Sequence, residues 1–353
     1  MMKRSLILLC TMASAAIGCT TLRADRVVSV VGGGEKEPAG VQALEVRLRE
    51  PFGVAFDPDG TMFVIEMSQG NRLLKKDLRG DITRVAGVGQ GGFSGDGGPL
   101  LGAQFNGPHN LAITPDGVLL IADTWNGRVR RLDRKSDIVT TLPGFQVPAS
   151  AGRDAGPYCV TLDFTGARLL VADLRRVHAV DLNTGKSSVV AGNGEKGIPR
   201  DGSVATDAPL VDPRAVAADR KGNVYILERG GHSLRVVDVQ GRIRTVVNAK
   251  GLKGATGDGG PAIEATMNGP KHLCVDLDDN VIIADAENHL VRKYVPKDSR
   301  IVRVAGTGKE GGGGLGGPPD KAQLARPHGV TVGPDGLLYI TDSYNNRILR
   351  IER

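Results

Sequence analysis

The stretch RVVSVVGGG at residues 26–34 lies near the N-terminus, yet it matches RIVRVAGTG at residues 300–308. Both stretches alternate in part between apolar and polar residues before a glycine-rich turn, which is typical of a strand with one buried face. The match indicates that the first strand of the chain is a displaced copy of a repeated element.

Six repeat units follow this strand, and each opens with a proline and an apolar strand. The openings PFGVAFDPDG at residues 51–60 and PHGVTVGPDG at residues 327–336 show the pattern. The opening prolines are Pro51, Pro108, Pro157, Pro213, Pro270 and Pro327, at intervals of 57, 49, 56, 57 and 57 residues. Each unit reads as four short strands bounded by Gly, Asp and Pro, and such regular units predict the blades of a β-propeller.

The end of the chain explains the displaced strand. The sixth unit stops at Arg353, directly after its third strand, and residues 26–34 supply the fourth. We therefore predict an all-β fold, a six-bladed β-propeller whose ring is closed by the N-terminal strand completing the last blade. The 50 glycines and 19 prolines fit a protein of many tight turns.

The first residues have the features of an export signal. Lys3 and Arg4 precede an apolar stretch at residues 5–18 that is too short to span a bilayer comfortably. Ala-Ile-Gly before Cys19 resembles a bacterial lipobox, which implies lipidation of Cys19; ordinary cleavage near Ala15 or after Ala24 is the alternative. We expect a signal peptide at residues 1–24 and a single propeller domain at residues 25–353.

Three hairpins carry a further signature, namely ADTWNGRV at residues 122–129, ADAENHLV at residues 284–291 and TDSYNNRI at residues 341–348. They resemble the NHL repeat, and so do the GDGGP linkers at residues 95–99 and 257–261. The resemblance covers residues 25–353 and implies a bacterial, exported NHL-type propeller that serves as a binding platform, although one related family is enzymatic. The third unit departs from it, because LRRVHA follows Asp173 with about three residues missing, so we expect a tighter hairpin there.

An acidic residue ends the second strand of every unit. The six members are Glu66, Asp123, Asp173, Glu228, Asp285 and Asp342. They could form a metal-binding ring, but a feature repeated in every blade usually belongs to the scaffold. We expect each carboxylate to accept backbone N–H groups across the following hairpin.

The histidines are distributed unevenly. His109 and His328 follow opening prolines, and His272 lies one position later in its unit. The starts of inner strands meet at the channel mouth, so three imidazoles could converge there, and neutral imidazole is a good metal ligand. The Pro-His pairs resemble motifs of peptidylglycine amidating lyase, which implies a divalent metal, zinc or calcium, bound by these three histidines. Polar lining of a wet channel is the alternative.

Four other residues follow opening prolines: Phe52, Tyr158, Arg214 and Lys271, and Asn110 follows His109. Together they predict a ligand-binding set at the channel mouth, suited to an anionic or sugar-like molecule held by charge and stacking. A variable, solvent-exposed lining is the alternative.

These observations favour a non-enzymatic binding or scaffolding propeller of the cell envelope, periplasmic and monomeric, with a small-molecule or protein ligand. A metal-dependent enzyme, amidating-lyase-like or lactonase-like, is the alternative, and no catalytic residue can be assigned. The net charge of +6 arises from basic residues interleaved with 39 acids, so no polybasic run points to nucleic acid. A membrane would be contacted only through a lipid on Cys19.

Overall fold

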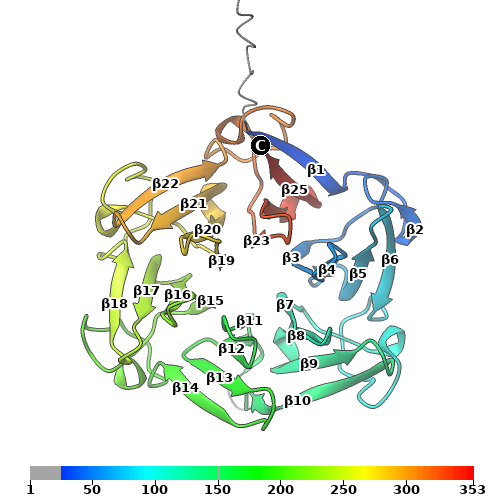
Figure 1. The fold of residues 1–353 in the computed structure, drawn as a ribbon, viewed down its shortest axis with the longest axis horizontal. Helices are drawn as coiled ribbons and strands as arrows, with labels where there is room; N and C mark the ends of the chain where they lie inside the picture. The colour runs from blue at the N-terminus through cyan, green and yellow to red at the C-terminus, as the bar shows by residue number, and fades with distance from the viewer. Residues whose placement is uncertain (1–24, 149–151) are drawn as a thin grey trace, which may run out of the picture.

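Six antiparallel sheets surround a central channel as the blades of a propeller (Figure 1). The structure is a computed structural model that describes residues 25–148 and 152–353. The expected signal peptide and Cys19 lie outside the described residues. No helix in the part of the chain that the structure describes is long and apolar enough to cross a membrane.

The blades follow one another along the chain, and each runs from an inner strand at the channel to an outer strand at the rim (Figure 1). Blades 1 to 3 consist of β3 (Pro51–Phe56), β4 (Met62–Glu66), β5 (Arg72–Lys76) and β6 (Asp81–Ala86); β7 (Asn110–Ile113), β8 (Leu119–Asp123), β9 (Arg128–Asp133) and β10 (Ile138–Gln146); and β11 (Cys159–Leu162), β12 (Arg168–Ala172), β13 (Val177–Asp181) and β14 (Ser187–Ala191).

Blades 4 to 6 repeat this arrangement. They consist of β15 (Pro213–Ala218), β16 (Val224–Glu228), β17 (Ser233–Val237) and β18 (Ile243–Val247); β19 (His272–Val275), β20 (Val281–Asp285), β21 (Leu290–Val295) and β22 (Arg300–Ala305); and β23 (Gly329–Val332), β24 (Leu338–Asp342) and β25 (Arg347–Glu352), completed by β1 (Arg26–Gly32). An additional strand, β2 (Ala39–Gln42), pairs with the outer edge of blade 1 and has no counterpart in the sequence analysis.

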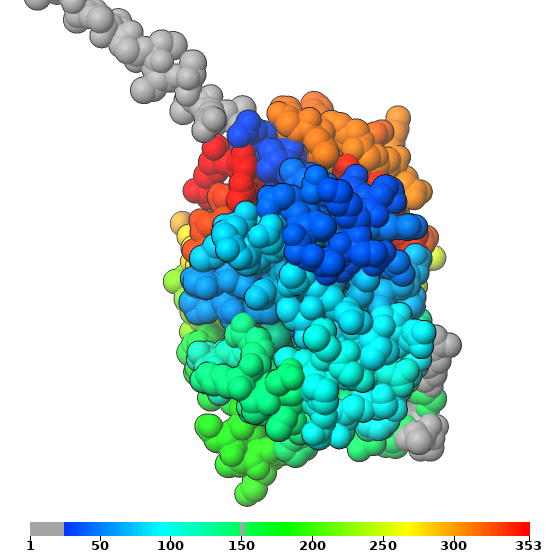
Figure 2. Space-filling view, turned by 90° about the vertical axis from the view of Figure 1, so that its right-hand side faces the viewer, coloured from blue at the N-terminus to red at the C-terminus, as the bar shows by residue number. Residues whose placement is uncertain are grey.

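The ring closes where the two ends of the described chain meet. β1 pairs antiparallel with β25, and the side chains of Val27 and Val31 are fully buried. Figure 2 shows the blue N-terminal residues packed beside the red C-terminal ones. The predicted six-bladed fold and its closure by the N-terminal strand are confirmed.

The hydrophobic core is divided into layers between neighbouring blades. Phe63 and Ile65 of blade 1 pack in one cluster with Leu111 and Ile121 of blade 2. Because a middle strand faces a neighbouring blade on each side, strands such as β4 and β20 are buried at every position. This burial explains why the second strand of each unit is a nearly continuous apolar run.

Short 3-10 helices mark the connections. The glycine-rich linkers contain η1 (Leu100–Gly102), η5 (Ala205–Asp207), η6 (Ala262–Glu264) and η8 (Pro319–Lys321), the three NHL-like hairpins contain η2 (Thr124–Asn126), η7 (Ala286–Asn288) and η9 (Ser343–Asn345), and η4 (Arg153–Ala155) precedes blade 3. The hairpin of blade 3 has none, and the N–H of Asp173 donates to the Arg176 carbonyl at 2.9 Å. The expected tighter hairpin is confirmed.

The glycine-rich linkers cover the outer edge of the blade that they enter. Gly97 donates its N–H to the Val139 carbonyl at 2.7 Å, and Val139 donates to Gly98 at 3.0 Å. Equivalent pairs join Gly259 and Gly260 to Ile301, Gly202 and Ser203 to Ile243, and Gly316 and Gly317 to Val27. Satisfying these edge groups removes a template for pairing with other chains.

The outer strand of blade 3 differs. Among the described residues, no linker donates to or accepts from its outer side. Its exposed Ser187 takes the register position of the buried Ile301 in blade 5. The polar residue fits an edge that stays in contact with solvent.

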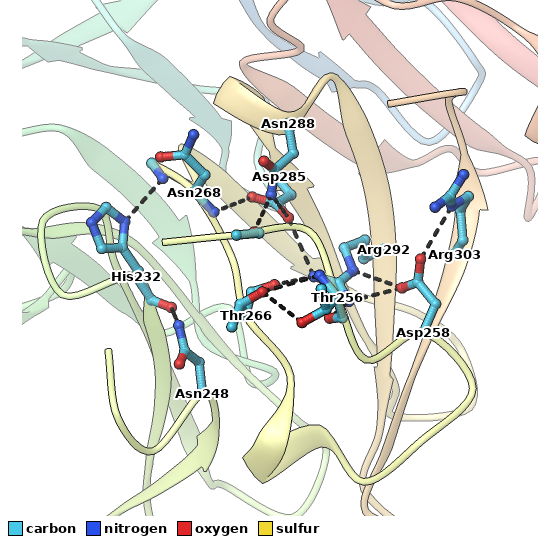
Figure 3. A network of polar contacts seen from close by, with 12 residues as sticks. His232, Asn248, Thr256, Asp258, Thr266, Asn268, Asp285, Asn288, Arg292 and Arg303 are labelled. Atoms are coloured by element: carbon cyan, nitrogen blue, oxygen red, sulfur yellow. Dashed lines mark hydrogen bonds and ion pairs between the residues drawn. The ribbon is translucent and has the colours of Figure 1, made fainter. Parts of the chain in front are cut away.

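In five of the six blades, a buried ion pair ties the blade to the linker before it. In blade 5, the Asp285 carboxylate accepts the N–H of Asn268 at 2.9 Å and lies 3.4 Å from the Arg292 guanidinium (Figure 3). Arg292 also donates to the Thr266 carbonyl at 2.6 Å and pairs with Asp258 at 2.8 Å. We call this arrangement the acid clamp, because one carboxylate holds both the third strand and the entering linker.

The acid clamp corrects the expectation for the six acidic residues. In five blades the carboxylate accepts an N–H from seventeen residues earlier, not from the following hairpin; the donors are Arg49, Asn106, Val211, Asn268 and Ala325. Their basic partners on the third strands are Arg72, Arg130, Arg235, Arg292 and Arg347.

Across the hairpin, the NHL asparagine replaces the expected backbone donors. Asn126 donates its side-chain amide to Asp123 at 2.8 Å, as Asn288 does to Asp285. Blade 3 lacks this asparagine, and there Asp173 accepts the expected backbone N–H groups of Arg175 and Arg176, with His178 as its basic partner.

Removing residues 25–32 should destabilise the whole propeller. Burial of Val27 and Val31 contributes about 1.5–3 kcal/mol each, and the deletion also leaves β25 without a partner. Urea unfolding, compared with a chain that starts at Asp25, measures the loss. An unchanged midpoint would contradict the closure of the ring by β1.

Replacing Arg292 with Met should cost about 3–5 kcal/mol of unfolding free energy, because Asp285 would be left buried and unpaired. Arg303 pairs with Asp258 at the surface, so Arg303→Ala is the matched control, with an expected cost below about 1 kcal/mol. Equal losses in the two variants would show that the acid clamp adds nothing beyond a surface pair.

Candidate ligand site at the channel mouth

The residues that follow the six opening prolines meet at one end of the channel. A cavity of about 30 Å³ is lined by Phe52, His109, Tyr158, Arg214, Lys271, His272 and His328. The structure thus brings together all of the residues expected at the mouth except Asn110. We call this set the mouth ring.

Aromatic contacts fill one half of the mouth ring. Phe52 stacks on His328 with ring centroids 4.1 Å apart, and it meets the edge of His109 at 5.1 Å. His109 in turn meets Tyr158 at 5.2 Å, and the Arg214 guanidinium lies 3.5 Å from the Tyr158 ring centre. These contacts leave Phe52 only 6% exposed and hold the side chains in fixed orientations.

Asn110 lies below the mouth ring and spans the channel. Its Oδ1 accepts the N–H of Val160 at 3.0 Å, and its Nδ2 lies 3.0 Å from Nε2 of His272. Blades 2 and 5 face each other across the channel (Figure 1), so this contact joins opposite sides of the ring. Asn110 is therefore engaged with the protein itself.

A larger cavity of about 490 Å³ continues beyond this bridge along the inner strands. Its lining includes Asn110, His272 and Cys274, and it reaches the turns at Pro58 and Pro334 on the opposite face. His272 is the one residue that lines both cavities. The Asn110–His272 contact therefore lies at the junction of the mouth and the lower channel.

Burial keeps the histidines of the mouth neutral. It lowers the pKa of His109 to about 3 and that of His272 to about 4, and it lowers the pKa of His328 well below its usual range. All three imidazoles are uncharged at neutral pH.

Cations dominate the other half of the mouth. Burial, reinforced by repulsion from Arg229 and Arg214, lowers the pKa of Lys271 to about 8. Arg214 and Arg229 both pair with Asp212, at 2.9 and 3.7 Å. Lys271 has no ion pair or hydrogen bond within the described residues, and the attraction of Glu287 that it feels is shared with Arg326.

The surroundings of the three histidines do not fit a divalent cation. Within residues 25–148 and 152–353, no group of three His, Cys, Asp or Glu residues is placed to hold a metal. Nδ1 of His109 donates its N–H to the Gly107 carbonyl at 2.7 Å, and Nδ1 of His272 accepts the N–H of Val330 at 3.3 Å, so these nitrogens are already engaged. Lys271 and Arg214 line the same cavity and would repel a metal ion.

The sequence analysis did not identify two further charged residues at this end of the molecule. Arg229 lines a groove of about 440 Å³ between blades 4 and 5 with His232, Lys253 and Glu287. Arg326 pairs with Glu287 at 2.6 Å. Arg229 directly follows Glu228, the acidic residue that ends the second strand of its unit, and Arg326 directly precedes the opening Pro327. These two positions are the signal in the sequence that could have placed both residues at the mouth.

Family models match parts of the chain. The NHL repeat model matches residues 105–132 and 324–351, which contain two of the three signature hairpins, and the teneurin NHL domain model matches residues 167–256. The chain carries NHL repeats in a six-bladed β-propeller.

Relatives of this NHL-repeat propeller include much longer proteins. Protein SUPPRESSOR OF QUENCHING 1, chloroplastic, of Arabidopsis thaliana is 27% identical over 86% of this chain, and the match spans 30% of the plant protein. NHL repeat-containing protein 2 of Gallus gallus is 24% identical over 84% of this chain and 46% of its own length. The chain therefore spans less than half of each of these relatives.

Solved structures share the fold of this NHL-repeat propeller at low sequence identity. An auxiliary nutrient binding protein from Bacteroides thetaiotaomicron has a TM-score of 0.69 at 15% identity, covering 93% of this chain and 76% of that one. Virginiamycin B lyase from Staphylococcus aureus has a TM-score of 0.55 at 13% identity, covering 93% and 99%. These likenesses establish the fold. The two proteins that share it are a binding protein and an enzyme.

The Lys271 amine should titrate near pH 8, and Arg229→Gln should raise its pKa because a neighbouring positive charge is removed. The chemical shift of the reductively ¹³C-methylated amine, followed against pH, measures both. Lys271→Arg assigns the resonance by removing it. A midpoint that Arg229→Gln leaves in place would contradict the repulsion between these two side chains.

Proposed function

We propose that this protein is an exported, non-enzymatic binding propeller that holds a small carboxylate or phosphate ligand at its channel mouth. Four cations, Arg214, Arg229, Lys271 and Arg326, surround this end of the channel, and only two carboxylates pair with them, Asp212 and Glu287. An anion would supply the missing charge.

The unpaired ammonium of Lys271 is the observation that carries the proposal. A half-buried cation without a partner is unfavourable in the free protein, and an anionic ligand would relieve that cost. The small mouth cavity would accept one end of such a ligand, while the stacked rings of Phe52, His328 and Tyr158 would keep the cations in place. The nutrient-binding protein of similar fold is consistent with a binding role.

Lys271→Ala should abolish stabilisation by citrate or inorganic phosphate. A ligand at about 100 times its Kd raises the unfolding free energy by about 2.7 kcal/mol, which thermal denaturation detects readily. Lys135 is an exposed lysine in the turn between β9 and β10 and does not line the mouth cavity, so Lys135→Ala is the control. Stabilisation that persists in Lys271→Ala, or none in the unsubstituted protein, would refute an anion site at the mouth.

The second candidate is a metal-dependent enzyme of the lyase or lactonase kind. It is favoured by the similar fold of virginiamycin B lyase, and it would require His109 to release the Gly107 carbonyl before binding a metal. Stoichiometric zinc or calcium in protein purified without chelators, lost on joint replacement of His109 and His328 by Ala, would replace the binding proposal with this one.

Export and anchoring can be tested separately. If Cys19 is lipidated, Cys19→Ala should move the protein from the membrane fraction to the soluble periplasm, because the lipid would be its one attachment. Fractionation with immunodetection measures the change. Identical distributions of the two proteins would favour ordinary secretion, and mass spectrometry of the mature N-terminus would then give the cleavage position.

A further inference from the structure

The groove of about 440 Å³ between blades 4 and 5 adjoins the mouth ring, and we call it the basic groove. Gly269 lines the groove and Lys271 lines the mouth cavity, only two positions later in the chain. Arg214 of the mouth and Arg229 of the groove share the Asp212 carboxylate, at 2.9 and 3.7 Å. The groove and the mouth are therefore neighbouring parts of one basic surface.

Glycines account for the open space in the basic groove. Gly230 lies two positions after the acidic residue of blade 4, where blades 2, 5 and 6 carry the large side chains of Trp125, Glu287 and Tyr344. At Gly269 the φ angle is +52°, and an added Cβ would lie 2.5 Å from Cγ of Glu287. The backbone therefore forms part of the wall, and the volume that remains is in the usual size range of sites for small ligands.

Hydrogen-bond donors without protein partners line the basic groove. Nδ1 of His232 accepts the N–H of Gly269 at 3.1 Å (Figure 3), so the neutral imidazole carries its proton on Nε2. Burial, with repulsion from Lys253 and Arg229, lowers the pKa of His232 and keeps the ring neutral at pH 7. Within the described residues, no atom accepts from this Nε2, from the Asn268 side-chain amide or from the Lys253 ammonium.

The cations of the basic groove lack matching acids. Arg229 and Lys253 are its positive residues, and Glu287 is the one carboxylate among the residues that line it. Glu287 is engaged by Arg326 at 2.6 Å. The Arg229 guanidinium lies 3.7 Å from Asp212, beyond hydrogen-bond length, and its buried Nε donates to no described atom. The groove therefore offers a place for an anionic group in addition to the one proposed at the mouth.

We propose that the mouth and the basic groove bind the two ends of one dicarboxylate, with one carboxylate on Lys271 and the other between Arg229 and Lys253. This inference rests on the proposed anion site at the mouth and extends it to a class of ligand. The mouth cavity of about 30 Å³ accepts only one end, whereas the groove has room for a carbon chain and the second carboxylate. The planar guanidinium matches that carboxylate, and Asn268 and Nε2 of His232 add neutral donors beside it.

The length of the ligand gives the first test. Isothermal titration calorimetry compares succinate, glutarate, adipate and pimelate with hexanoate, which has the carbon chain of adipate but a single charge. One dicarboxylate should bind about tenfold to a hundredfold more tightly than hexanoate, the usual effect of a hydrogen bond to a charged group. Affinity should peak at one chain length, because the two cationic ends have a fixed separation. Equal affinities for all five ligands would overturn the proposal.

Lys253→Ala should lower the affinity for the best dicarboxylate to about that of hexanoate, because the groove loses a cation. Hexanoate binding should stay unchanged, since its one carboxylate is held at the mouth. Lys250 is an exposed lysine of the same linker that does not line the groove, so Lys250→Ala is the matched control. A dicarboxylate preference that survives in Lys253→Ala would refute the assignment of the second carboxylate to the groove.

Lys271→Ala separates failure of the mouth site from failure of this inference. The substitution should weaken the binding of hexanoate and of the best dicarboxylate alike. If it leaves both unchanged, the mouth site is wrong and this inference falls with it. If hexanoate binding depends on Lys271 but no dicarboxylate binds more tightly than hexanoate, the mouth site stands and only the contact in the basic groove is disproved.

Discussion

A buried carboxylate positions the channel mouth. In five blades the acid clamp holds the backbone N–H that lies three residues before the member of the mouth ring; in blade 2, for example, Asp123 holds Asn106 and the mouth residue is His109. The clamp therefore fixes where each mouth side chain enters the channel. An ion pair buried between blades also needs all of its hydrogen bonds to be satisfied, so it tolerates little displacement.

The charges of the mouth follow from this rigid frame. Lys271 enters the mouth beside Arg214 and Arg229, whose charges repel its ammonium, and the neutral histidines contribute no charge to balance it. The site is consequently basic on the side of blades 4 to 6 and aromatic on the side of blades 6 to 3. A ligand would meet two different chemistries across one opening.

The repeats predicted the blades well because each blade is a local unit, with strands in sequence order and turns of recognisable composition. The closure was predictable for the same reason: residues 26–34 carry the pattern of an outer strand, and only blade 6 lacked one. The sequence also placed the mouth residues correctly in space, since their position after an opening proline fixes the end of the inner strand.

Interactions between distant residues were not predictable in this way. The basic partners of the clamps come from two different positions of the third strand, as Arg292 and Arg347 show, so aligned units display no single arginine column. The bridge from Asn110 to His272 depends on the diameter of the ring, which no single unit specifies. The bridge has a wider consequence, because it connects two opposite blades directly. A substitution of either residue would therefore be felt on the far side of the disc as well as at its own blade.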